Sequence, residues 1–331
     1  LLKIYDIGPN IFKAATNEVH ILLYEKKNGR PKDLEVYSNT GLKMLTYNDQ
    51  KFDKLKMCKN SKCPLNDKLK KIHVYTLQSE CPYCSFKTER LNRIRIKINA
   101  SMLNLVNKID QNGNLNYINI NDFPKLIRGE EDKGLKAVKR LLKNHTRESC
   151  VFINAKSDLT YYRYQKNKSF DIKKIPPEKM KGNDYEYYLK PKLLIKHNTT
   201  YPVSVYTEER VCFTSSIYSL LHDSKIELKF LCALLNSTLI KFYCIFGINN
   251  QVNTTINLNQ YMIRHLPVIA ANDDTKEKLA TKVDSINSFY KQLKDKTHRI
   301  ATLKEEIDTI IFQLYSISEE EKMLVFKNIQ E

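Results

Sequence analysis

Apolar and polar positions follow two different periods along the chain. Apolar runs at residues 1–7 and 19–24 predict two strands, because Gly8 and Pro9 break the first run. The first two-thirds of the chain is expected to be strand-rich, with one helix at residues 135–142. Further strands are predicted by alternating or continuous apolar residues at 115–120, 150–153, 193–196, 203–206 and 211–220.

Helical spacing of apolar residues dominates the last third of the chain. Leucines at steps of three and four predict a helix at residues 226–243, and the Asn-rich segment 249–259 predicts a loop. Two apolar stripes at 279–293 and 300–314 predict helices that pack within the chain. Ser318, followed by three glutamates, is typical of a helix N-terminus. The pattern as a whole predicts a mixed α/β fold of the α+β kind.

Length and composition narrow the class of protein. A chain of 331 residues with 42% hydrophobic residues is long enough for two or three domains with ordinary cores. Lys229 and Lys241 interrupt the most apolar stretch, 228–248, so no run reaches the ~20 apolar residues of a membrane span. The start of the chain shows no signal-peptide pattern. We therefore expect a cytoplasmic protein without a membrane partner.

The positive charge is concentrated in the middle of the chain. The formal net charge is +18, and residues 51–200 hold 33 Lys and Arg against 15 Asp and Glu. Residues 1–50 and 201–331 are close to neutral, at +1 and −1. A lysine-rich bias from an AT-rich genome would spread the excess evenly. The uneven distribution instead favours contact with a polyanion such as nucleic acid.

Four of the eight cysteines form the strongest chemical signal. Cys58-x4-Cys63 and Cys81-x2-Cys84 are two close pairs, which is the spacing of a structural, tetrahedral zinc site. The alternatives are four reduced thiols or a disulfide, and His73 is a second-choice ligand. The remaining cysteines lie in apolar runs and are expected to be buried: Cys150, Cys212, Cys232 and Cys244.

Aromatic and basic residues interleave between residues 158 and 196. Lys and Arg pair with phosphates, Arg also forks to guanine edges, and Tyr stacks on bases. For any single residue a solvated basic face is the simpler explanation, but the set as a whole favours DNA. Loops in 120–200 and 245–260 are expected to read the bases. The candidate DNA-binding residues are Arg128, Tyr161, Arg163, Lys190, Lys192 and Lys196.

Catalytic signals are missing from the sequence. We find no nucleophilic triad, and none of the 8 glycines forms a phosphate-binding loop. The carboxylates of Glu305, Glu306 and Asp308 lie in a helical segment and are expected to be solvated. The sequence therefore favours a binding function over catalysis.

Several segments resemble one known family in its own order. The heptapeptide Lys-Pro-Lys-Leu-Leu-Ile-Lys at 190–196 and Leu-Leu-Asn-Ser at 234–237 resemble a strand and a helix of TaqI-like specificity domains. His-Leu-Pro at 265–267 resembles the strand that follows. The ending from Glu-Ile-Asp to Leu-Tyr at 306–315 is similar to that of type IIG restriction-methyltransferases. Residues 4–24 resemble the final β-hairpin of their methyltransferase domain.

The resemblance implies the C-terminal part of an enzyme, bacterial or phage-encoded, that methylates adenine N6 in duplex DNA. The family's Asn-Pro-Pro-Tyr motif and glycine motif do not occur here, so no catalytic or cofactor residue carries over. S-adenosylmethionine would be bound by an N-terminal half outside this chain, and that half would complete base flipping. The expected partners are double-stranded DNA and the rest of the methyltransferase polypeptide. The fragment alone is expected to be inactive.

The expected organisation has four parts. They are the end of a methyltransferase sheet, a zinc-ribbon-like insertion, a TaqI-like DNA specificity domain and C-terminal helices, at residues 1–33, 34–120, 121–270 and 271–331. Two other functions stay open. One is a specificity subunit of a type I restriction system, which would need a second recognition domain. The other is a zinc-stabilised protein-protein adaptor with an incidentally basic surface.

Overall fold

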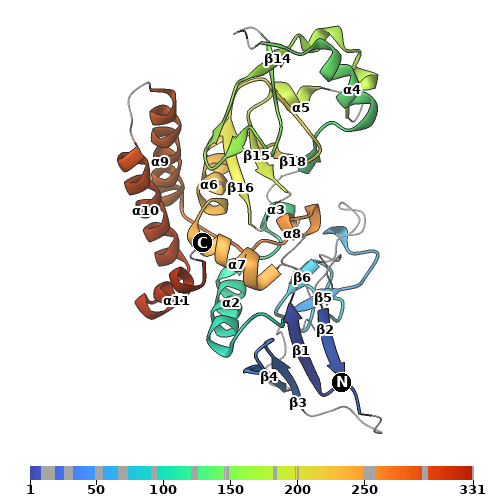
Figure 1. The fold of residues 1–331 in the computed structure, drawn as a ribbon, viewed down its shortest axis with the longest axis vertical. Coiled ribbons are helices and arrows are strands. Elements are labelled where there is room, and N and C mark those ends of the chain that lie inside the picture. Colours follow the sequence, from blue (N-terminus) through green and yellow to red (C-terminus); the bar gives the residue numbers. More distant parts are fainter. Residues whose placement is uncertain are drawn as a thin grey trace.

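The computed structural model describes most of the chain. The described residues are 1–8, 19–25, 33–48, 55–65, 74–90, 95–120, 126–144, 146, 149–181, 185–197, 199, 201–248, 258–292 and 297–329. Their arrangement is an elongated molecule with an N-terminal sheet at one end, a β-rich unit at the other and a flank of helices (Figure 1).

The chain begins in a four-stranded sheet with the order β2-β1-β3-β4. The strands β1 (Lys3–Gly8) and β2 (Val19–Leu23) form the predicted antiparallel pair. The sheet then continues through β3 (Asp33–Tyr37), which runs parallel to β1, and β4 (Lys43–Asn48). Strands β3 and β4 lie within the segment expected to be an insertion, so the N-terminal sheet extends beyond residue 33.

A smaller unit with the four clustered cysteines follows. It contains the sheet β6-β5-β7, built from β5 (Lys56–Cys58), β6 (Val74–Thr76) and β7 (Glu89–Arg90). The helix α2 (Ala100–Asn112) then enters the main core with Leu105, Val106 and Ile109. The mixture of small sheets and helices confirms the α+β class.

The predicted strand at residues 115–120 is wrong, because this segment turns into a helix. After the two-residue strand β8 (Gly113–Asn114), the Asn114 side chain accepts a hydrogen bond from the Asn116 N–H at 2.9 Å, and α3 (Tyr117–Ile120) begins. Such an Asn-centred turn competes with an extended backbone. The apolar alternation reflects burial of Leu115 and Tyr117 and not a β-ladder.

Two four-stranded sheets form the β-rich unit between residues 126 and 220. The outer sheet contains β10 (Lys143–Asn144), β14 (Lys168–Phe170), β11 (Cys150–Ile153) and β17 (Val211–Phe213), in that order. The inner sheet contains β16 (Val203–Thr207), β15 (Lys192–Lys196), β18 (Ile217–Leu220) and β9 (Leu126–Arg128). The short elements around them are α4 (Asp132–Leu141), β12 (Leu159–Thr160), β13 (Arg163–Tyr164), the 3-10 turns Ile172–Lys174 and Pro177–Lys179, and α5 (Glu186–Leu189).

The inner sheet carries a separate core on each face. Leu193 and Ile195 face the main core, while Leu194 between them faces a second core shared with the outer sheet. This alternation follows from the two-residue period of a strand. The predicted strands at 150–153, 193–196 and 203–206 are confirmed. The predicted strand at 211–220 is divided between β17 and β18, which belong to different sheets.

The predicted helix at 226–243 is broken in two. Helix α6 (Lys225–Leu235) ends at Asn236, and the chain bends by 62° before α7 (Thr238–Tyr243) begins. Helix α7 then continues into a π-helical turn, Cys244–Ile248. The Asn236 side chain accepts from the Ser204 N–H at 2.8 Å and donates to the Ser204 carbonyl at 2.9 Å, which ties the break to β16. The Ser237 hydroxyl then caps α7 by accepting from the Ile240 N–H.

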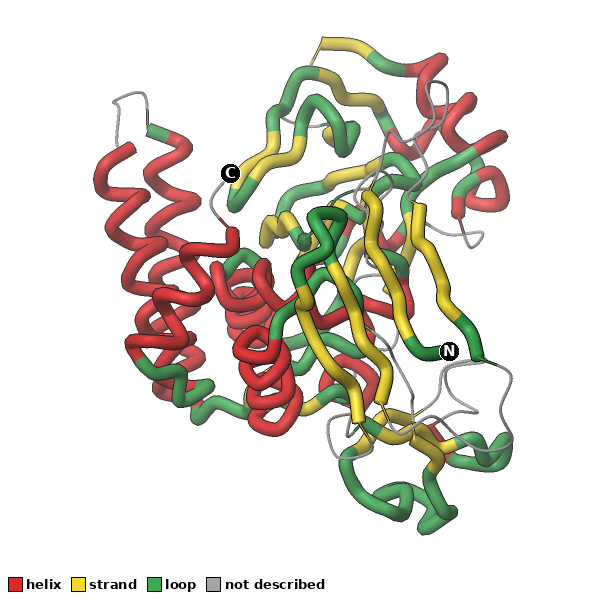
Figure 2. The backbone as a smooth tube through the Cα atoms, turned by 60° about the horizontal axis from the view of Figure 1, so that its bottom comes forward, coloured by secondary structure: helices red, strands yellow, loops and turns green. Residues whose placement is uncertain are grey.

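The C-terminal part is helical, as predicted. A short helix, α8 (Gln260–Arg264), and the strand β19 (Val268–Ile269) lead into α9 (Asp273–Lys291), α10 (Thr297–Leu314) and α11 (Glu319–Ile329). Figures 1 and 2 show α9 and α10 side by side along one flank of the molecule. The predicted cap is present, because the Ser318 hydroxyl accepts from the Glu321 N–H. The predicted loop at 249–259 lies largely outside the described residues.

No single helix in the described ranges combines the length and the apolar character that crossing a bilayer requires. The bent pair Lys225–Leu235 and Thr238–Ile248 meets the requirement by length and composition only.

Candidate metal centre and nucleic-acid surface

Four cysteines from two turns come together beside the small sheet β6-β5-β7. Cys58 ends β5, and Cys63 follows in a turn where its N–H donates to the Asn60 carbonyl at 3.1 Å. Cys81 and Cys84 lie in a second turn. The four sulfur atoms all lie within 4.8 Å of one another, and no other such group of His, Cys, Asp or Glu occurs among the described residues.

The spacing of the thiols fits one tetrahedral metal ion. The Sγ atoms of Cys58 and Cys84 are 3.7 Å apart, and those of Cys63 and Cys81 are 3.9 Å apart. Four sulfurs placed about 2.3 Å from a zinc ion in tetrahedral geometry are roughly 3.8 Å from one another. Disulfide sulfurs are only about 2.05 Å apart. The four cysteines are therefore not joined in disulfides, and their spacing is compatible with a shared metal ion.

The second turn holds its two cysteines by backbone hydrogen bonds. The Ser85 N–H donates to the Cys81 carbonyl at 2.8 Å, and the Cys81 N–H donates to the Phe86 carbonyl at 2.8 Å. Ser85 takes the left-handed conformation, with φ at 54°, where the chain turns back. This short loop presents both thiols on the same side, as the Cys-x2-Cys spacing predicts.

The thiols of Cys58 and Cys84 differ in pKa. Burial raises the pKa of Cys58, which is fully buried, to about 12. Partial burial also opposes ionisation of Cys84, but hydrogen bonds from the Phe86 N–H and the Asn60 amide outweigh it and lower the pKa of Cys84 to about 7. A metal ion requires thiolates, so binding would displace the protons that remain.

Apart from the thiols, few apolar side chains support the cysteine unit. Its small core contains five buried residues, of which three are cysteines and the others are Leu65 and Val74. A core of this size stabilises little on its own, which is the situation that a structural metal remedies. The donor set is closed, since three of its four members are buried. The alternative ligand His73 lies outside the described residues.

The predicted DNA-binding residues do not form one surface. Tyr161 and Arg163 lie in the β12–β13 hairpin, beside a cavity of about 880 Å³ between this hairpin, β16 and α9. Arg163 is exposed, lines the cavity and places its guanidinium 5.4 Å from the ring of Tyr290. The ring of Tyr161 stacks on that of Tyr201, with 6.2 Å between centroids.

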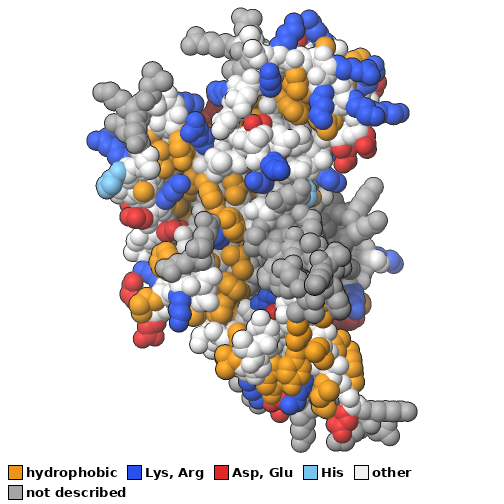
Figure 3. Space-filling view, viewed as in Figure 1, with side chains coloured by type: hydrophobic (Ala, Val, Ile, Leu, Met, Phe, Trp, Pro, Cys, Tyr) orange, Lys and Arg blue, Asp and Glu red, His pale blue; other side chains and the backbone are white. Residues whose placement is uncertain are grey.

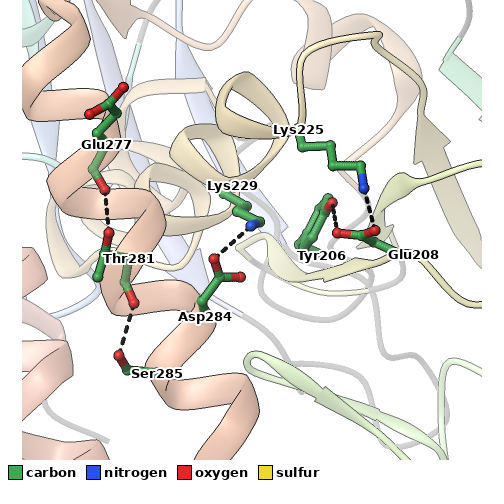
Figure 4. A network of polar contacts seen from close by, with 8 residues as sticks. All are labelled: Tyr206, Glu208, Lys225, Lys229, Glu277, Thr281, Asp284 and Ser285. Carbon is green, nitrogen blue, oxygen red and sulfur yellow. Dashed lines mark hydrogen bonds and ion pairs between the residues drawn. The ribbon is translucent and has the colours of Figure 1, made fainter.

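A polar network joins the elements beside this cavity (Figure 4). Lys229 on α6 pairs with Asp284 on α9 at 2.6 Å. The Tyr206 hydroxyl donates to Glu208 at 2.8 Å, and Lys225 pairs with the same carboxylate at 2.5 Å. The Lys225 and Tyr206 hydrogen bonds hold the pKa of Glu208 below its usual range. The carboxylates of Glu208 and Asp284 are therefore each paired with a lysine, so their negative charge opposes an approaching polyanion less than free carboxylates would.

Lys192 is not available to DNA in this structure. Its side chain has no exposed surface, and its Nζ donates to the carbonyls of Tyr188 at 3.1 Å and Glu209 at 3.0 Å. Burial lowers the pKa of Lys192 to about 8. Lys192 and Leu194 are two residues apart in β15, so both side chains point to the same face of the sheet, toward the second core. We therefore assign Lys192 a structural position and leave it out of the DNA contacts discussed below.

The other candidates are accessible and lie apart. Lys190 follows α5 and pairs with Glu186 at 2.6 Å, with about half of each side chain exposed. Lys196 ends β15 and is partly exposed. Arg128 ends the edge strand β9, where 46% of its side chain is exposed. The structure thus places Arg163 beside α9 and the other three on separate elements of the β-rich unit.

Sequence reasoning did not single out one cationic face that the described residues form. Helix α4 has its buried side at Gly134 and Val138 and exposes a row of cations on its other side, where Figure 3 shows Lys and Arg side chains gathered. The amphipathic spacing in residues 132–141 was a usable signal, because basic and apolar positions alternate there with helical period. The exposed cations of α4 are Lys133, Lys136, Lys139 and Arg140.

Comparison with known proteins identifies the β-rich unit. The model of the TaqI-like C-terminal specificity domain matches residues 70–268. The match includes both sheets of the β-rich unit, helices α6 to α8 and the second cysteine pair. It begins well before residue 121, where the sequence analysis placed the start of the recognition domain, and it ends close to the expected boundary at 270. No curated protein matches the chain.

Proposed function

Because the chain belongs to the family of TaqI-like C-terminal specificity domains, we propose that it is the target-recognition region of an adenine-specific DNA methyltransferase of the type IIG restriction-modification kind. Family membership implies recognition of DNA sequence in a restriction-modification context. The match over residues 70–268 is the observation that carries the proposal. The enzyme type and the methylated base rest on the resemblances of the N-terminal hairpin and the C-terminal ending.

The charge distribution supports DNA as the ligand. The excess of +18 falls entirely within residues 51–200, which include most of the matched domain. Lysines and arginines that face phosphates supply most of the affinity of such proteins, independently of sequence. In this proposal the exposed face of α4 binds phosphates, together with Arg163, Lys190 and Lys196. Tyr161 stays a candidate for stacking, although its ring already packs on Tyr201.

We also propose that the four cysteines hold a structural zinc ion. The donor set, its spacing and its burial fit zinc, and a closed site leaves no position for a reacting water. Cys58 and Cys63 would be joined to Cys81 and Cys84, so that the sheet β6-β5-β7 keeps its shape. Zinc therefore stabilises this unit and takes no part in methyl transfer.

The methyl-transfer chemistry belongs, in this proposal, to another part of the enzyme. The described residues offer no glycine-rich cofactor loop, and the sequence has no Asn-Pro-Pro-Tyr motif. S-adenosylmethionine would bind to the methyltransferase part, against which the N-terminal sheet would pack. The role of this chain is to dock on duplex DNA and select the site.

Two other functions make different predictions. A specificity subunit of a type I system would share the recognition fold and a helical spacer, for which α9 and α10 would be suitable. It would bind duplex DNA equally well but would pair with a separate methyltransferase subunit. A zinc-stabilised adaptor would show no salt-dependent binding to duplex DNA.

Binding of this chain to duplex DNA across a salt series tests the proposal. The assay uses a labelled pool of random-sequence duplexes with unlabelled random competitor, and sequencing of the bound fraction. Affinity that falls steeply with salt, together with enrichment of one short sequence, supports target recognition. A steep salt dependence without enrichment would contradict sequence recognition by this chain. Absence of binding at low salt would favour the adaptor.

A further inference from the structure

Two hollows in the surface meet beside the β12–β13 hairpin. The first is the cavity of about 880 Å³ described above, which has α9 as its second wall. The second, of about 1040 Å³, lies beside the start of β11 and the 3-10 turn Ile172–Lys174. Both hollows are lined by Lys166, Glu208 and Glu209, so together they form one continuous groove, which we call the hairpin groove.

Three of the four carboxylates that line the hairpin groove are paired with lysines. Glu208 and Asp284 each pair with a lysine of α6 that lies outside the lining (Figure 4). Glu209 pairs with Lys166 at 2.6 Å and accepts a hydrogen bond from the Tyr164 hydroxyl at 2.6 Å. Burial opposes ionisation of Glu209, but these hydrogen bonds outweigh it and lower its pKa. The negative charge of these three carboxylates is therefore compensated within the protein.

Four exposed cations along the same groove form no ion pair within the described part of the chain. Arg163 and Lys291 line the hollow beside α9. Lys173 and Arg210 line the other hollow. The fourth carboxylate, Asp171, accepts the backbone N–H of Lys173 at 3.1 Å and caps the 3-10 turn. The groove therefore presents more unpaired positive charge than unpaired negative charge.

The two walls beside α9 also offer hydrogen-bond donors. The guanidinium of Arg163 lies 5.4 Å from the ring of Tyr290, and a contact with the face of a ring leaves the guanidinium N–H groups available. On the opposite wall, positions 284, 287, 288 and 291 of α9 line the cavity, which is the spacing of one helix face. This face carries the side chains of Asn287, Ser288 and Lys291.

We propose that the hairpin groove binds the sugar-phosphate backbone of duplex DNA between the β12–β13 hairpin and α9. Phosphates are contacted by Lys and Arg and also by Asn, Gln and Ser side chains, all of which line the groove. Helix α9 begins at Asp273, beyond the matched residues 70–268, so the DNA interface extends past the specificity domain onto the C-terminal helices. The inference rests on the proposed function and names a surface for its ligand.

The salt dependence of duplex binding by a double variant tests the groove. Arg163→Gln combined with Lys291→Gln removes one cation from each wall. The control combines Arg299→Gln with Lys327→Gln, at exposed positions of α10 and α11. If both groove cations contact phosphates, the slope of log affinity against log salt becomes shallower by about 2, and the control keeps the wild-type slope. The sequence preference should stay that of the wild type, because phosphate contacts carry no sequence information.

The outcomes separate this inference from the proposed function. A groove variant with the wild-type slope would overturn the inference, favour an acidic protein segment as the occupant and leave DNA recognition standing. Equal changes of slope in the groove and control variants would also overturn it, because only net charge would then matter. A wild-type chain that does not bind duplex DNA would overturn both. If Arg163→Gln lowers the temperature of thermal unfolding, Lys291→Gln alone decides, with an expected change in slope of about 1.

Discussion

The backbone N–H and the hydroxyl of Thr238 both donate to the carboxylate of Asp308, which joins the start of α7 to the middle of α10. The N–H contact measures 2.8 Å, and Asp308 lies 70 residues further along the chain. The expectation that Asp308 is solvated is therefore wrong. The spacing of apolar residues shows which face of α10 is apolar. It does not show that Thr238 lies beside that face and donates hydrogen bonds to a carboxylate there.

Replacement of Asp308 by Ala should destabilise the protein by roughly 1–3 kcal/mol, because two donors of Thr238 lose their acceptor in a partly buried place. Burial raises the pKa of Asp308 above 3.8, although the Thr238 hydrogen bonds oppose this shift. An acid whose folded pKa is raised binds protons more tightly when folded, so its contribution to stability falls as pH rises through that window. Asp308→Asn should lose this component. Urea unfolding of wild type and Asp308→Asn from pH about 4 upwards measures it, and equal pH profiles would contradict it.

Burial of the Lys192 ammonium should make the free energy of unfolding depend on pH in the alkaline range. Its pKa is about 8 when folded against 10.5 in the unfolded chain. The unfolded state then binds more protons between these values, so the free energy of unfolding should rise with pH across that window, by on the order of 3 kcal/mol. Lys192→Met preserves the length of the side chain and should flatten the rise. The same variant should keep the wild-type salt dependence of DNA binding; a shallower dependence would return Lys192 to the DNA contacts.

Retention of zinc by the protein should require both cysteine pairs. Purified protein is expected to contain about one zinc per chain, and Cys58→Ser or Cys84→Ser should remove nearly all of it. Cobalt substitution provides an independent readout, since thiolate-to-cobalt absorption should appear in the wild type and disappear in both variants. Cys232→Ala, which removes a buried thiol outside the cluster, is the control and should keep the metal. Zinc retained at wild-type level in both serine variants would rule out this donor set.

The exposed cations of α4 should determine the salt dependence of binding. A triple variant of Lys133, Lys136 and Lys139 to Gln removes three charges without touching the buried side of the helix. If all three face phosphates, the slope of log affinity against log salt should become shallower by about 3. The control removes the same number of charges from the C-terminal helices, at Lys278, Arg299 and Lys327, and should leave the slope unchanged. Equal slopes in both triple variants would move the phosphate contacts elsewhere.

Local patterns were sufficient to predict many elements and insufficient to place them. The strands at 150–153 and 193–196 and the C-terminal helices follow from period and length, because burial of one or both faces leaves a direct trace in the sequence. The break at Asn236 does not, since it depends on hydrogen bonds to Ser204 in a distant strand. For the same reason no apolar pattern could show that 211–220 crosses between two sheets.

The candidate sites were predictable to different extents. The four cysteines are close in sequence, so their spacing alone predicted the cluster that the structure assembles. Lys192 and Arg128 illustrate the opposite case, because both are basic residues in strands of the same sheet. Lys192 faces a core, whereas Arg128 lies at an accessible edge of the sheet. The difference depends on which strands pair and on which face of the sheet each position in a strand points to.

The inner sheet, with one core on each face, limits how a new target preference can be engineered into this scaffold. Exchange of the outer sheet alone would leave Leu194 and Val205 facing side chains from a foreign protein, while exchange of single strands would disturb the helices behind Leu193 and Ile195. The smallest transferable module is therefore the whole segment from β9 to β18, cut ahead of the helix α6. Its acceptor must supply the counterpart of Asn236, since that side chain fastens the module through Ser204.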